Sequence, residues 1–169
     1  FSEVTAYTEP SIGVCDPNLE DKTWWDELKQ DPKFKPEYWS RYYDYLLRKP
    51  SWSITAVEDI NSSTDEIMNA LTNPRKGVAG ERMGMVFGYV QSGKTAHYIG
   101  MINKAYDAGY RIVIVLSGIH NSLRSQTQSR IDEEVLGYET SLESIGDMTR
   151  ERNVIGVGVG PHNQVETVV

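Results

Sequence analysis

The segment Gly88 to Thr95, which reads GYVQSGKT, constrains the fold of this chain more than any other stretch of its sequence. It fits the spacing G-x-x-x-x-G-K-T of a phosphate-binding motif, in which each fixed residue has its own physical role in binding. Such a loop needs a strand before it and a helix after it, because the helix N-terminus then points at a bound anion. The apolar run 83–87 precedes the loop, and a helical pattern over 95–108 follows it. We therefore expect a phosphate-binding loop here.

The residue types in this loop predict a site for Mg²⁺-ATP. Gly93 would let the backbone approach the phosphates, and Lys94 would reach the β- and γ-phosphates as a compact charge. The hydroxyl of Thr95 would ligate Mg²⁺. Lys94 and Thr95 are thus the expected catalytic residues, with Thr95 as the expected metal ligand. The full set expected to contact the nucleotide is Gly88, Val90, Gln91, Ser92, Gly93, Lys94, Thr95 and Ala96.

The chain from residue 81 onward alternates between strand-like and helix-like patterns. Residues 112–116 are five consecutive branched apolar residues, which is typical of a parallel strand buried on both faces. Residues 121–137 have a helical pattern, and 154–159 (VIGVGV) indicate a further strand. The order β, α, β, α, β predicts an α/β fold with a parallel sheet and right-handed crossovers.

Residues 1–80 have a different, helical and acidic pattern. Thr23 is placed to cap a helix that ends at Asp31-Pro32, and a second helix is expected over 37–49. The segment 63–66 (STDE) has the form of a capping box and predicts the start of a third helix. Residues 73–80, rich in Pro, Gly and charge, are the expected linker.

All four tryptophans lie in this N-terminal part of the chain. Their helical spacing and acidic surroundings favour packing in a helical core or against the second domain. Stacking on exposed nucleic-acid bases is the alternative interpretation. The four residues are Trp24, Trp25, Trp39 and Trp52.

Composition narrows the class of protein and its compartment. The net charge of −7 is not typical of a free-standing nucleic-acid-binding module, which is usually basic. Cys15 is the only cysteine, so an intrachain disulfide is impossible and a reducing compartment, the cytoplasm, is expected. The longest apolar runs are too short to span a bilayer, so we expect no membrane partner.

The remaining motifs exclude some nucleotide-binding classes and suggest that the chain is incomplete. No N-K-x-D or D-x-x-G motif of a GTPase is present. Residues 132–134 (DEE) follow a helical pattern and are interpreted as a solvated helix face, not as a Walker B carboxylate pair. Because the chain starts at Phe1 and stops at Val169 within an apolar patch, we expect a piece of a longer protein whose Walker B motif lies further on. Such a piece would bind nucleotide but hydrolyse it poorly.

Residues 82–132, RMGMVFGYVQSGKTAHYIGMINKAYDAGYRIVIVLSGIHNSLRSQTQSRID, resemble the N-terminal ATPase region of the Z1-domain family. These are bacterial DEAD–Z1 helicase-like proteins, including motor subunits of restriction and phage-defence systems. The segments GYVQSGKT and SGIHNSLRSQTQSR carry the resemblance. It implies a RecA-like P-loop NTPase lobe over 81–169, preceded by the helical region 1–80. It also implies ATP-driven translocation on double-stranded DNA, with a nuclease in another subunit or domain.

Under this resemblance, the loop and helix that follow residue 116 would contact the DNA backbone. Short polar groups and long hydrogen-bond donors there suit phosphate oxygens. Leu123, Thr127 and Ile131 would form the buried side of the helix. An amphipathic helix with ordinary surface polar residues is the alternative. The DNA-contact candidates are Ser117, Gly118, Asn121, Arg124, Gln126, Gln128 and Arg130.

Two aspects of function stay open. Many DEAD-box proteins read adenine with a glutamine upstream of the loop, but no glutamine lies between Gln30 and Gln91. Arg75, Arg82 or an aromatic group are the candidates for contacting the base. The alternatives to a DNA translocase are a nucleotide-gated switch and a non-motor ATP-binding module, either of which would regulate a partner nuclease.

Overall fold

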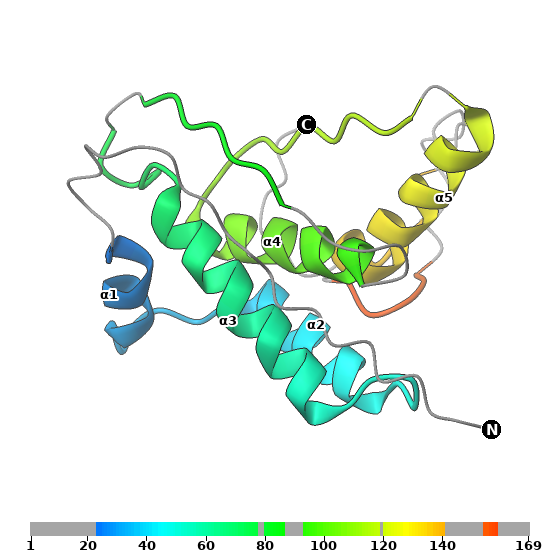
Figure 1. Ribbon diagram of the computed structural model, residues 1–169, viewed down its shortest axis with the longest axis horizontal. Helices are drawn as coiled ribbons and strands as arrows, with labels where there is room; N and C mark the ends of the chain where they lie inside the picture. The colour runs from blue at the N-terminus through cyan, green and yellow to red at the C-terminus, as the bar shows by residue number, and fades with distance from the viewer. Residues whose placement is uncertain (1–22, 78–79, 87–92, 119, 141–153, 159–169) are drawn as a thin grey trace.

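The part of the chain that the structure describes is built from helices. A computed structural model describes residues 23–77, 80–86, 93–118, 120–140 and 154–158. Figure 1 shows α5 leading away from the other helices at one end of the molecule. The helices are α1 (Trp24–Gln30), α2 (Glu37–Arg48), α3 (Ile54–Ala70), α4 (Lys94–Ala108) and α5 (Asn121–Ile131), followed by a π-helical turn, η1 (Asp132–Leu136).

The predicted α/β fold with a parallel sheet, and with it the RecA-like lobe, is wrong for the described part of the chain. Residues 80–86 and 110–118 form no strand there, and both run as coil in Figure 1. Between Tyr138 and Val154 the structure has only an isolated antiparallel bridge. The apolar run that predicted a buried strand is mostly exposed, with Ile112 at 77% and Leu116 at 92%, although Val113 packs against the hydrophobic core. An apolar run favours extended backbone, but a sheet also needs neighbouring strands to accept its hydrogen bonds and cover its side chains.

The first two predicted helices are confirmed, and the third begins earlier than expected. The predicted helix 37–49 corresponds to α2, and the break at Asp31-Pro32 follows the end of α1. The predicted capping box at 63–66 is wrong, because α3 starts at Ile54, where Ser53 caps it by accepting from the N–H of Ala56 at 3.1 Å. Ser63 instead lies mid-helix and donates back to the carbonyl of Ile60 at 3.2 Å, as buried serines in helices do.

The core lies where α2, α3, α4 and η1 meet. The tryptophans predicted to pack internally do so at three of four positions, with Trp24, Trp25 and Trp39 between 1% and 8% exposed. Trp52 is only half-buried. A smaller cluster joins α1 to the ends of α3 and α4 through Trp24, Trp25, Met68 and Ala108. The main cluster comprises Trp39, Tyr42, Leu46, Val57, Ile60, Ala96, Ile99, Ile102 and Val135.

Helix α4 therefore shares one core with helices from the N-terminal part of the chain. A side chain at Gly100 would come within 3.0 Å of Trp39, so α2 and α4 approach closely there. The division of the chain at residue 80 stays a prediction. None of the described helices is long and apolar enough to cross a membrane.

Candidate nucleotide-binding site

The N-terminus of α4 coincides in the sequence with the end of the predicted phosphate loop. Gly93 is the N-cap residue and has left-handed backbone angles, φ 77° and ψ 14°. The first intrahelical bond runs from the N–H of His97 to the carbonyl of Gly93 at 3.1 Å. No side chain caps this helix. Because the first N–H groups of a helix have no intrahelical acceptor, an uncapped N-terminus attracts an anion.

The structure places part of the predicted nucleotide-binding set at this helix end. Lys94 is exposed and Thr95 is half-buried, both in the first turn. Ala96 is buried in the core, and its carbonyl accepts from the hydroxyl of Tyr42 at 3.2 Å. Ala96 can therefore offer a ligand only its backbone N–H. The remaining members of the set, Gly88, Val90, Gln91 and Ser92, lie outside the described residues.

A tryptophan that the sequence did not connect with the loop packs against Gly93. The Cη2 atom of Trp52 lies 2.9 Å from the position that a Cβ on Gly93 would occupy. Any side chain at Gly93 would therefore meet the indole and also be strained by the positive φ. Trp52 belongs to the α2–α3 connection, and no sequence signal links it to the loop because the contact depends on how α2 and α3 pack against α4.

His97, in the first turn of α4, is held by α3. Its Nε2 lies 2.7 Å from the hydroxyl oxygen of Ser63. Because that hydroxyl donates its proton to the carbonyl of Ile60, we infer that Nε2 carries a proton and donates to Ser63. Burial, together with the nearby charge of Lys104, lowers the pKa of His97. Ser63 is thus not activated as a nucleophile, and the pair serves to join α4 to α3.

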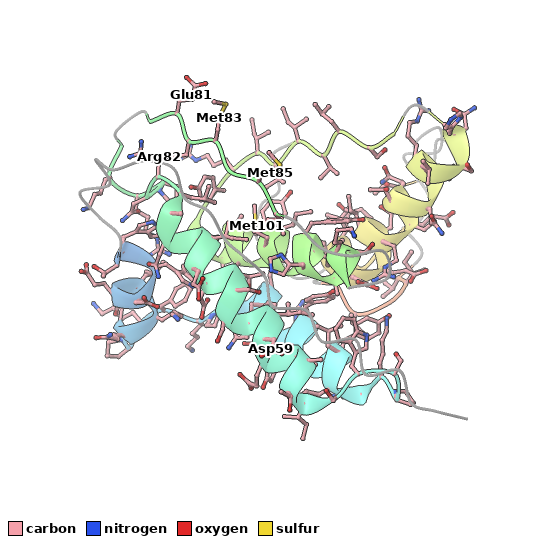
Figure 2. The ribbon with its side chains drawn as sticks, viewed as in Figure 1. Asp59, Glu81, Arg82, Met83, Met85 and Met101 are labelled. Atoms are coloured by element: carbon pink, nitrogen blue, oxygen red, sulfur yellow. The ribbon has the colours of Figure 1, made fainter. Side chains whose placement is uncertain are left out.

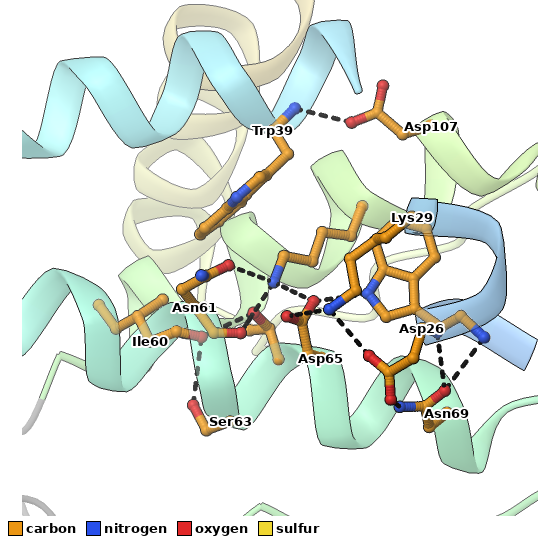
Figure 3. Close-up of polar contacts among 12 residues, drawn as sticks. Asp26, Lys29, Trp39, Ile60, Asn61, Ser63, Asp65, Asn69 and Asp107 are labelled. Carbon is orange, nitrogen blue, oxygen red and sulfur yellow. Dashed lines mark hydrogen bonds and ion pairs between the residues drawn. The ribbon is translucent and has the colours of Figure 1, made fainter. Parts of the chain in front are cut away.

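An ion-pair network centred on the buried side chain of Lys104 continues this connection along α4 (Figure 3). The ammonium group of Lys104 donates to Asp65 at 2.6 Å and to the backbone and side-chain oxygens of Asn61 at 2.8 and 2.9 Å. It also lies 4.2 Å from the ring centroid of Trp39. Asp65 pairs in addition with Lys29 at 2.8 Å. Since the donors of Lys104 are all used inside the protein, this lysine is not available to a phosphate group.

Burial is the main influence on the pKa values of this pair. Burial lowers the pKa of Lys104 to about 8, although Asp65 opposes the shift. Burial alone would raise the pKa of Asp65, but the charge and hydrogen bonds of Lys104, with help from Lys29, hold it below its ordinary value. Both groups are ionised at pH 7, so the pair is a salt bridge.

The predicted DNA-contact residues separate into two groups. Gly118, Asn121, Arg124 and Gln126 are exposed, and Ser117 is half-buried. The other two, exposed Gln128 and half-buried Arg130, contact neighbouring side chains. Gln128 donates to Asp132 at 2.9 Å and to Thr140 at 2.5 Å, and Nη2 of Arg130 donates to Glu134 at 3.0 Å.

The expected buried side of this helix is wrong for Leu123, which is 48% exposed. Contacts with the core begin only near the end of α5, where Ile131 packs against the main cluster. The first turns of α5 therefore present their residues to solvent.

The interpretation of residues 132–134 as a solvated helix face is also wrong. Asp132 and Glu134 are 3% and 2% exposed. Asp132 accepts from the backbone N–H of Thr140 at 3.0 Å. Nε of Arg130 lies 2.8 Å from Glu134 as an ion pair, and Lys49 lies 3.5 Å from the same carboxylate. Cations and hydrogen-bond donors compensate the charge of these buried acids.

Comparison with known proteins assigns this chain to no family and no fold. No family model, curated protein or solved structure matches this chain. Within the described ranges, no group of three or more His, Cys, Asp or Glu residues is placed to hold a metal ion.

Proposed function

We propose that this chain binds Mg²⁺-ATP through the loop 88–95 and the first turn of α4. The observation that carries the proposal is the left-handed Gly93 at the uncapped N-terminus of α4, followed directly by exposed Lys94 and by Thr95. The helix end supplies N–H groups and a positive dipole, and Lys94 adds a charge for the β- and γ-phosphates. Thr95 fits Mg²⁺, which prefers oxygen ligands and keeps waters and phosphate oxygens in most of its positions.

We further propose that this site belongs to a DNA-dependent, helicase-like ATPase that works with a nuclease. The resemblance of residues 82–132 to Z1-domain ATPases supports this step. Arg124 and Gln126 support it as well, because both are exposed on α5 and offer donors to DNA phosphates. Asp132 and Glu134 are bound by internal partners, so we do not assign either of them to Mg²⁺ or to the attacking water.

A nucleotide-gated switch is the second candidate function, and the contacts of α4 favour it. The first turn of α4 is joined to α3 through His97 and Ser63, and to α2 through Ala96 and Tyr42. A nucleotide at the end of α4 would therefore act on groups that also touch the N-terminal helices. Such coupling could signal nucleotide state to a nuclease without translocation.

ATP hydrolysis by the whole protein tests these proposals. Hydrolysis should be stimulated by double-stranded DNA and lost in Lys94→Ala, while Lys33→Ala, which removes an exposed lysine away from the site, should behave as wild type. Displacement of a bound roadblock would then identify a translocase, and DNA stimulation without displacement would identify a switch. Hydrolysis that ignores DNA would contradict both and favour a non-motor ATP-binding module.

A further inference from the structure

Trp52 is the tryptophan of this chain whose packing is incomplete. Trp24, Trp25 and Trp39 are buried, and each has an internal polar or charged partner. Trp52 packs on the main cluster but stays half-buried, so part of its indole faces solvent. Its position beside Gly93 puts that partly exposed ring next to the end of α4 that carries Lys94 and Thr95.

The α2–α3 connection holds this indole in place. The backbone N–H of Trp52 donates to the carbonyl of Lys49 at 3.0 Å, one turn after α2. Ser53, the next residue, caps α3 by accepting from the N–H of Ala56. The backbone on both sides of Trp52 is thus fixed by a helix end. A preorganised ring loses little conformational freedom when a flat ligand group stacks on it.

The arginines that the sequence offered for the base lie elsewhere. Arg75 donates to the carbonyl of Ala108 at 3.0 Å, so it belongs to the C-terminal end of α4. A helix of 15 residues is about 22 Å long, which keeps Arg75 far from the phosphate loop. In Figure 2, Arg82 also lies toward the C-terminal end of α4, and Met83 and Glu81 beside it point away from the helices.

We propose that Trp52 binds the base of the nucleotide by stacking, an inference that rests on the proposed binding of Mg²⁺-ATP at α4. With the phosphates held by Lys94, Thr95 and the helix end, the ring beside Gly93 is the aromatic group on which we place the base. Stacking uses the π-face that every base presents and needs no hydrogen bonds to the base edge. The site therefore takes purine nucleoside triphosphates with weak discrimination between adenine and guanine.

Calorimetry with two ligands, Mg²⁺-ATP and Mg²⁺-tripolyphosphate, tests this role of Trp52 on the full chain. Trp52→Ala should weaken ATP binding about tenfold and leave tripolyphosphate binding within about twofold of wild type. Trp52→Phe, which keeps an aromatic face, should retain most of the ATP affinity and guards against a misfolded alanine variant. Wild-type protein should bind GTP within about tenfold of ATP.

The outcomes separate this inference from the proposed function. If wild type binds both ligands and loses both in Lys94→Ala, the phosphate site stands. Equal losses for ATP and tripolyphosphate in both Trp52 variants, or no loss of ATP affinity in Trp52→Ala, would then overturn the stacking role alone. If wild type binds neither ligand, the phosphate site and the stacking role fall together.

Discussion

The ammonium group of Lys104 lies 2.6 Å from the carboxylate of Asp65, and this ion pair joins α4 to α3 in the interior of the protein. Removing one partner leaves the other charge buried without compensation. We predict that Asp65→Ala lowers the free energy of unfolding by about 3 kcal/mol. The double variant Asp65→Leu/Lys104→Met, which removes both charges, should recover a large part of that loss. Denaturant unfolding measures both values, and a double variant less stable than Asp65→Ala would contradict the account.

Asp107, near the end of α4, caps the start of α2 and should make stability depend on pH. Its carboxylate accepts from the backbone N–H groups of Tyr38 at 3.0 Å and Trp39 at 2.8 Å. Burial raises the pKa of Asp107 to about 6, although these N–H donors oppose the shift.

Between about pH 4 and pH 6, the folded chain therefore holds more protons at Asp107 than the unfolded chain does. We predict that wild type loses stability relative to Asp107→Asn as the pH rises through this window, since asparagine keeps an acceptor but does not titrate. Unfolding curves of both proteins at several pH values measure the difference. If the difference in free energy of unfolding between the two proteins stays constant, or grows in favour of wild type, the pKa of Asp107 is not raised in the folded protein.

Gly93 is constrained twice, by its positive φ and by Trp52. Gly93→Ala should therefore destabilise the protein by about 2 kcal/mol, more than the backbone conformation alone explains. Gly77→Ala is the matched control, because Gly77 has φ 65° and nothing within 4 Å of an added Cβ. Thermal unfolding compares the two. If both variants lose the same free energy of unfolding, the indole of Trp52 moves aside without an energetic penalty. If the indole does oppose the new methyl group, adding Trp52→Ala to Gly93→Ala should recover the part of the loss that exceeds that of Gly77→Ala.

The two arginines of α5 should separate DNA binding from folding. Arg130 is tied to the buried carboxylate of Glu134, so Arg130→Ala should lower the free energy of unfolding by about 2 kcal/mol. Arg124 is exposed, so Arg124→Ala should leave stability within about 0.5 kcal/mol of wild type. If α5 contacts DNA, Arg124→Ala should also reduce the salt slope of DNA binding in the whole protein by about one. An unchanged slope and affinity would remove Arg124 from the DNA-contact candidates.

The elements that could be predicted are those fixed by local chemistry. Proline and glycine set helix ends that the sequence reveals, as at Asp31-Pro32 and at Gly109, which ends α4 with φ 102°. The strand predicted at 112–116 fails because an apolar run does not specify its neighbours, and in the described structure Ile112 and Leu116 stay exposed.

Contacts between distant elements were beyond the reach of sequence patterns. The motif predicted Gly93 and Lys94 at the start of a helix, which the structure has. It could not indicate Trp52 beside Gly93, or Lys104 between Asp65 and Asn61, because helix packing alone creates those contacts. Glu134 was misread in part for the same reason, since Lys49 lies far from it in the sequence. Its pair with Arg130 has the local i,i+4 spacing, which the sequence does show.

Calorimetric titration of the chain with Mg²⁺-ATP tests most directly whether the end of α4 binds the phosphates. Wild type and Lys33→Ala should bind with the same affinity, and Lys94→Ala should bind at least about tenfold more weakly while unfolding at the same temperature. Equal ATP affinity in a folded Lys94→Ala protein, or no binding by wild type, would contradict the proposed nucleotide site.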